Sequence, residues 1–122
     1  MDIVPEVHRA LANMIELFSL IVGIWGLINF ARNKPPDGNY NGALAVAVGL
    51  FAVEAIAGIV LLFMGRAPSR DIHWLYGVTM VLLVPAIFFF TRGSNTRRES
   101  FLYGAGMIFI WGLAERAAET GR

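Results

Sequence analysis

The sequence predicts an all-α integral membrane protein, a four-helix bundle with up-down-up-down topology. Of its 122 residues, 57% are hydrophobic and only 16% are charged, whereas soluble domains are about half apolar and about a quarter charged. The charged residues also gather in short gaps between four apolar runs. These runs are continuous rather than alternating, which favours helices over the strands of a membrane barrel. The length fits a single domain, residues 1–122.

Each of the four apolar runs is predicted to cross the membrane. They cover residues 10–31, 42–64, 72–91 and 101–118. A spanning helix needs about 20 mostly apolar residues, and the first three runs meet this length. The fourth is apolar only as far as Ala114, and it reaches full length through the amphipathic stretch that follows. We predict a span there as well, because "FLYGAGMIFIWGLA" is too apolar to remain in water.

The gaps between the runs carry residues typical of turns. Their sequences are "NKPPDGNYN", "GRAPSRD" and "RGSNTRRES". Loops this short place consecutive helices antiparallel, so the first and third spans run parallel. Both termini and the middle loop are then expected on one side of the membrane. Within the third run, Pro85 predicts a kink, and a kink can widen a cavity.

Several functional classes are excluded by composition. The absence of cysteine excludes disulfides, thiolate metal sites and covalent heme attachment. A net charge of +1, without a basic patch, argues against a nucleic-acid partner. No nucleophile–base pair and no phosphate-binding loop occurs in the sequence, so it identifies no catalytic residue and leaves enzymatic activity open.

The two histidines occupy matching positions. His8 and His73 each stand at the start of an apolar run, and these two runs are predicted to be parallel. Both imidazoles should therefore lie at the same membrane face, at similar depth, on different helices. Two such imidazoles can bind one iron from opposite sides, and heme b fits between the facing helices of a bundle. Gly77, one helical turn after His73, would leave space for a flat ring.

Four arginines are expected at the same membrane face, where guanidinium groups could pair with heme propionates. They are Arg9, Arg66, Arg70 and Arg116. Other interpretations stay open for the histidines. They could be interfacial residues without a ligand, or each could bind the magnesium of a chlorophyll-type pigment. A copper or zinc site would need a further ligand, for which only Asp71 or Glu115 stands nearby.

The pattern of a histidine opening a helix, followed by a small residue four positions later, resembles membrane b-type cytochromes and the four-helix halves of heme A synthase. The resemblance covers all four spans and rests on His8, His73 and Gly77. It implies one b-type heme between the first and third helices, in a redox protein linked to electron transfer or quinones. Those families generally carry more histidines than this chain. The two halves of the chain also resemble each other, which favours an internal duplication.

Two carboxylates fall within the apolar runs, at Glu16 and Glu54. Ionisable groups at membrane depth are functional candidates. Both are expected to be buried and largely neutral. Glu54 is also expected to lack an internal partner, because every arginine lies in a gap or at a helix end. Glu16 belongs to a stripe that is expected to face the bundle interior, with the glycines making close helix contacts. The stripe consists of Asn13, Glu16, Ser19, Gly23 and Gly26.

Three functional hypotheses follow for a multi-pass protein of the bacterial inner membrane. The preferred one is a subunit that holds one b-type heme between His8 and His73. The second is a cofactor-free accessory subunit, packed in the bilayer against a respiratory or photosynthetic complex or against copies of itself. The third is a small proton- or cation-coupled transporter that uses Glu16 and Glu54. A glutamate in the first of four spans resembles the small multidrug-resistance transporters.

Overall fold

The structure is a computed structural model that describes residues 3–65 and 72–120. These residues form four helices and no strand, so the all-helical prediction is confirmed. The helices are α1 (Ile3–Ala31), α2 (Gly38–Phe63), α3 (Ile72–Thr91) and α4 (Arg97–Thr120). α1 and α3 end at the same residues as the corresponding predicted runs. The main difference is at the starts, because α1, α2 and α4 each begin several residues before the run that predicted them.

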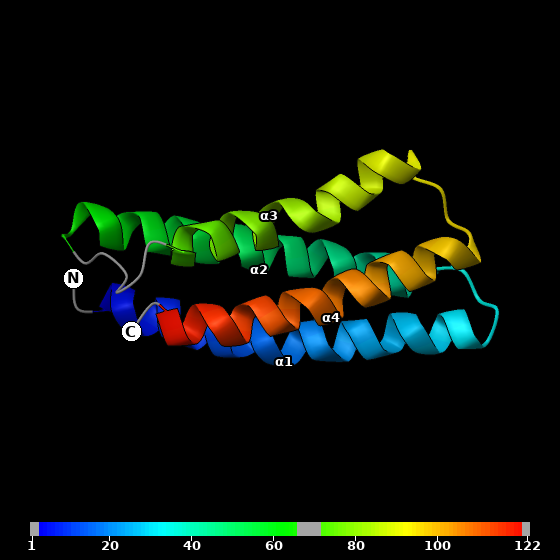
Figure 1. Ribbon diagram of the computed structural model, residues 1–122, viewed down its shortest axis with the longest axis horizontal. Helices are drawn as coiled ribbons and strands as arrows, with labels where there is room; N and C mark the ends of the chain where they lie inside the picture. Colours follow the sequence, from blue (N-terminus) through cyan, green and yellow to red (C-terminus); the bar gives the residue numbers. More distant parts are fainter. Residues whose placement is uncertain (1–2, 66–71, 121–122) are drawn as a thin grey trace.

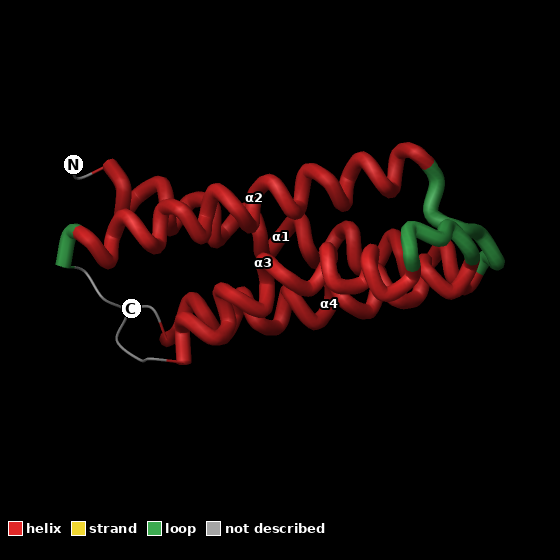
Figure 2. Tube along the Cα trace, turned by 90° about the horizontal axis from the view of Figure 1, so that it is seen from above, coloured by secondary structure: helices red, strands yellow, loops and turns green. Residues whose placement is uncertain are grey.

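Consecutive helices run antiparallel and lie side by side around a square (Figures 1 and 2). α1 and α4 share the most extensive interface, whereas α2 and α3 share the least extensive one. Within the described residues α1 and α3 make no close backbone contact, nor do α2 and α4, so these pairs occupy the diagonals. We call the end that carries the start of α1 and of α3 the terminal end. The opposite end, with loops 32–37 and 92–96, is the loop end.

Within the described part of the chain, three helices are long and apolar enough to cross a membrane. They are Ile3–Ala31, Gly38–Phe63 and His73–Phe90. Large apolar side chains point outward on all four helices, and Phe63 and Phe90 are 84% and 79% exposed. Such surfaces suit contact with lipid rather than with water.

Glycine brings α1 and α4 into backbone contact. A Cβ atom on Gly104 of α4 would lie 2.7 Å from the Leu27 nitrogen and 2.9 Å from the Gly26 carbonyl carbon. Real Cβ atoms do not approach other atoms this closely, so only glycine fits. On α1, a Cβ on Gly23 would lie 2.7 Å from the side chain of Ile108. The predicted close contacts at Gly23 and Gly26 are therefore confirmed.

The predicted interior stripe of α1 is only partly correct. Ser19, Gly23 and Gly26 are buried and Glu16 is half-buried, but Asn13 is exposed. The reason is geometric. Each step of three residues falls short of a full turn, so Asn13 lies about 140° around the helix from Gly26.

The start of α4 is fixed by a capping box at the loop end. Glu99 is fully buried and accepts hydrogen bonds from the backbone N–H of Thr96 at 2.8 Å and from its hydroxyl. Arg98 donates to the other carboxylate oxygen at 2.8 Å. Burial alone would raise the pKa of Glu99, but these hydrogen bonds outweigh burial and hold its pKa below the usual range.

The same turn of α4 is tied to the end of α1. Arg97 donates to the Phe30 carbonyl at 2.8 Å, and its guanidinium lies 3.9 Å above the Phe30 ring. Ser100 donates to the Lys34 carbonyl at 2.6 Å. The end of α1 and the start of α4 are thus held together at the loop end.

Gly104→Ala should destabilise the bundle by about 1–3 kcal/mol, the usual cost of overpacking, because the added methyl would collide with the α1 backbone. Thermal unfolding in detergent measures the loss. Gly112→Ala on the same helix is the control, because a Cβ there would meet nothing within 4 Å. Equal melting points for the two variants would contradict the close α1–α4 contact.

Glu99→Gln should lower the melting temperature at neutral pH, where the native carboxylate is ionised and fully hydrogen-bonded. Because the folded-state pKa is lowered, this contribution is present above the unfolded-state pKa. It is lost as the pH falls through the folded-state pKa. The melting points of the wild type and Glu99→Gln should therefore converge in acid. A gap that stays constant with pH would refute the ionised cap.

Candidate functional site

The two histidines meet inside the bundle at the terminal end. His8 lies in the second turn of α1 and His73 in the first turn of α3. Although these helices are diagonal to each other, the ring centroids are only 6.4 Å apart, and the ring planes are inclined by 65°. Both side chains therefore point inward, toward the same point between the four helices.

His8 is held by two residues of α2. Its Nδ1 atom lies 2.9 Å from Oε1 of Glu54, within ion-pair distance, and both atoms are buried without a hydrogen-bond partner among the described residues. The edge of the ring lies over Gly58, where an added Cβ would be 3.3 Å from the His8 Cε1 atom. A larger residue at position 58 would displace the imidazole. Glu54 and Gly58 thus fix where the ring lies and which nitrogen is engaged.

His73 is held by the backbone of α4. Its Nδ1 atom lies 3.0 Å from the carbonyl oxygen of Ala117. A carbonyl oxygen only accepts, so Nδ1 of His73 carries the proton and donates it. In a neutral imidazole with this tautomer, the lone pair is on Nε2.

Both rings therefore have Nδ1 next to an acceptor, one a carboxylate and the other a carbonyl. This is the arrangement of metal-binding histidines, whose second nitrogen is held by such partners. The spacing also fits. With a metal–nitrogen bond of about 2 Å, two imidazoles that share one ion have centres roughly 6 Å apart, and the observed separation is 6.4 Å.

Small residues lie on the helices around His73. Gly77 lies one turn deeper on the same face of α3, and a Cβ atom there would meet nothing within 4 Å. On α4, Ala114 and Ala117 are buried, and the larger Leu113 packs against the core. Among the residues described by the structure, no group of three or more His, Asp or Glu could hold a metal ion by itself.

The predicted propionate partners are less well placed. Arg9 and Arg116 are both exposed at the terminal end, where a charged group could reach them from the bundle edge. Arg66, Arg70 and the further ligand candidate Asp71 lie outside the described residues. Pairing of these arginines with a propionate stays a prediction.

The expectation that Glu54 has no internal partner is wrong. Its burial is confirmed, at 7% exposure, but His8 lies within contact distance. The sequence argument considered arginines only and placed His8 ahead of the first span. Because α1 begins at Ile3, His8 lies inside the helix, where it faces Glu54. Glu16, the other candidate carboxylate, is half-buried on α1 and is not part of this cluster of His8, Glu54 and His73.

Comparison with family models, with curated proteins and with solved structures finds no match to this chain. The resemblance to b-type cytochromes and heme A synthase therefore stays a prediction, carried by the histidine geometry alone.

Glu54→Ala should destabilise the bundle by about 1–3 kcal/mol, because it removes the carboxylate that lies 2.9 Å from the buried Nδ1 of His8. Glu54→Gln should cost less, since the amide has a similar shape and keeps an oxygen near Nδ1. Thermal unfolding measures both changes. In a His8→Phe background the difference between Ala and Gln at position 54 should disappear. An unchanged difference in that background would show that Glu54 acts independently of His8.

Proposed function

We propose that this chain is a four-span membrane protein that holds one b-type heme between His8 and His73. The observation that carries the proposal is the pair of inward-facing imidazoles. Their centroids are 6.4 Å apart, and each Nδ1 lies next to an acceptor. In a neutral imidazole whose Nδ1 carries the proton, Nε2 is the nitrogen that can coordinate iron.

The membrane assignment rests on three helices with the length and composition of membrane spans. α4 is added as the fourth span because it packs along α1 through backbone contacts. A helix so placed runs parallel to the bundle axis beside three spans. The location in the inner membrane of a bacterium, predicted from the sequence, is part of this proposal.

The residues around the two histidines would have separate tasks in binding the cofactor. Glu54 and the Ala117 carbonyl orient the two imidazoles, and Gly58 and Gly77 leave room beside them. Heme, when bound, would supply one-electron redox chemistry. The single histidine pair provides for one heme at one face of the membrane. Electron transfer across the membrane through two hemes would require a second pair, which the chain lacks.

The same contacts favour one alternative. A His8–Glu54 pair and a His73–Ala117 hydrogen bond would also join helices in a cofactor-free accessory subunit. In that case the His8–Glu54 contact and the His73–Ala117 hydrogen bond would serve only to join the helices. The transporter hypothesis has less support, because Glu54 contacts His8 and Glu16 lies outside the cluster.

The absorption spectrum of protein purified from a heme-sufficient host decides between these functions. A six-coordinate b-type heme gives a Soret band and a sharp α band on reduction, and we expect about one heme per chain. His8→Ala and His73→Ala should each abolish the low-spin spectrum. Gly58→Leu should lower heme content by displacing the His8 ring, whereas Gly49→Leu on the same helix should not, because a Cβ there meets nothing within 4 Å.

Colourless wild-type protein that also fails to bind added hemin would reject the heme proposal and favour the accessory subunit. Circular dichroism of every variant shows whether the helices remain intact. A spectrum that survives both histidine substitutions in folded protein would assign any bound heme to another site.

A further inference from the structure

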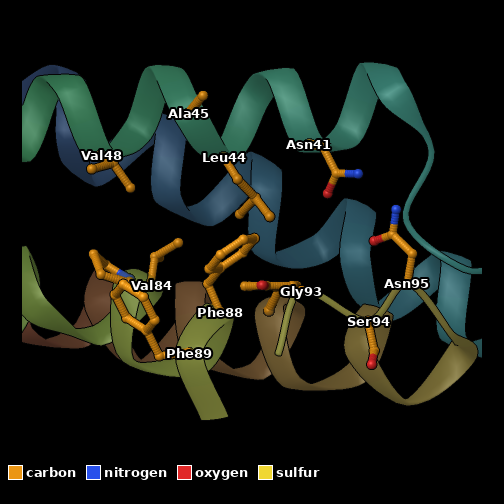
Figure 3. Close-up of a pocket in the computed structure, with 12 residues that line it drawn as sticks. Asn41, Leu44, Ala45, Val48, Val84, Phe88, Phe89, Gly93, Ser94 and Asn95 are labelled. Atoms are coloured by element: carbon orange, nitrogen blue, oxygen red, sulfur yellow. The ribbon is translucent and has the colours of Figure 1, made fainter. Parts of the chain in front are cut away.

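A groove of about 570 Å³ lies between α2 and α3 at the loop end, away from the histidine pair. Its walls come from α2 and α3, and loop 92–96 and α4 close it at the loop end (Figure 3). The lining residues are Asn41, Leu44, Ala45, Val48, Val84, Pro85, Phe88, Phe89, Gly93, Ser94, Asn95 and Tyr103.

The groove exists because α3 diverges from α2. α2 and α3 share the least extensive interface of the bundle, and Figure 1 shows the second half of α3 leaving the other helices. Pro85 lies within this half and cannot donate a backbone hydrogen bond to Val81, which weakens the helix there. Gly93, with a φ of +73°, then turns the chain back and packs against the Phe88 ring.

The groove is polar at one end and apolar along the rest of its length. Figure 3 shows Asn41 of α2 and Asn95 of the loop reaching toward each other at the loop end. Leu44 and Phe88 face each other farther in, followed by Val48. Neither asparagine side chain is hydrogen-bonded to another described residue, so their amide N–H groups can donate to a ligand.

The lining contains no charged side chain, and this limits the ligand. A phospholipid headgroup is anionic or zwitterionic, and a site that selects one would present a cation to the phosphate. The two asparagine amides instead suit a neutral head that accepts hydrogen bonds. The aromatic ring of Phe88 favours a planar head, because flat rings stack on its face or meet it edge-on. The volume is in the range of small-molecule sites.

We propose that this groove binds a neutral, membrane-dissolved amphiphile with a planar head that accepts hydrogen bonds, the chemistry of an isoprenoid quinone. The head lies between Asn41 and Asn95, and the tail follows Leu44 and Val48 toward the bilayer interior. The proposal rests on the groove alone and is independent of heme binding at the terminal end.

The test is photolabelling of the detergent-purified chain with an azido-quinone that carries a short isoprenoid tail. Saturable labelling is expected on segments 41–48 and 84–89. The double substitution Asn41→Ala and Asn95→Ala should weaken binding at least about tenfold through the loss of two hydrogen bonds. Asn39→Ala is the matched control, because Asn39 lies on the same turn of α2 but is exposed and does not line the groove.

A second pair of variants tests the tail. Val48→Phe fills the groove and should reduce labelling, whereas Val46→Phe, on the outward face of α2, should not. Unchanged melting temperatures show that all variants are folded.

Unlabelled short-tail quinone should displace the probe, and phosphatidylglycerol at the same concentration should not. Equal displacement by both would make the groove a general lipid contact and overturn the proposal. Non-saturable labelling, or equal labelling of the double asparagine variant and Asn39→Ala, would overturn it as well. Because none of these measurements depends on heme content, their failure is distinguishable from failure of the heme proposal.

Discussion

The bundle depends on one close contact, in which the backbones of α1 and α4 touch at Gly26 and Gly104. The same point joins α2, because the Tyr40 hydroxyl lies against Gly26 and donates to the Val22 carbonyl at 3.1 Å. Three helices are thus fixed to one another in the half of the bundle nearer the loops. α3 makes no contact of this kind with α2, and its divergence there leaves the groove.

At the terminal end a glycine makes room for a side chain rather than for a backbone. A Cβ on Gly58 would lie 3.3 Å from the His8 ring, so glycine at this position lets the imidazole lie against α2. The His8 ring centroid is then 6.4 Å from that of His73, on the helix diagonal to α1. Burial of these polar groups is costly unless each finds a partner, which explains why Glu54 and the Ala117 carbonyl lie at the two Nδ1 atoms.

The sequence predicts what depends on one helix at a time. Apolar run length predicted the four helices. The capping box at Thr96 and Glu99 was not predicted, although the spacing in "TRRE" is a local signal for the start of a helix. Asn13 was wrongly placed inside because the predicted stripe neglected the rotation of about 100° per residue along α1. Contacts between helices depend on axial register and rotation, which no local pattern contains, and for this reason the His8–Glu54 pair was missed. The groove is an intermediate case, because Pro85 predicts a kink but not which neighbour α3 leaves.

The partners of the two histidines share a sequence relationship that the fold makes visible. Glu54 and Ala117 each stand fourteen residues after a buried tyrosine, Tyr40 on α2 and Tyr103 on α4. Glu54 and Ala117 therefore occupy equivalent positions in the two halves of the chain, and each lies at Nδ1 of a histidine. At Glu54 the contact is made by the side chain, and at Ala117 by the backbone carbonyl. A duplicated two-helix unit would produce this relationship. The two imidazoles differ in how substitution affects their partners. A substitution at Glu54 removes the carboxylate next to His8. A side-chain change at position 117 leaves in place the backbone carbonyl that accepts from His73.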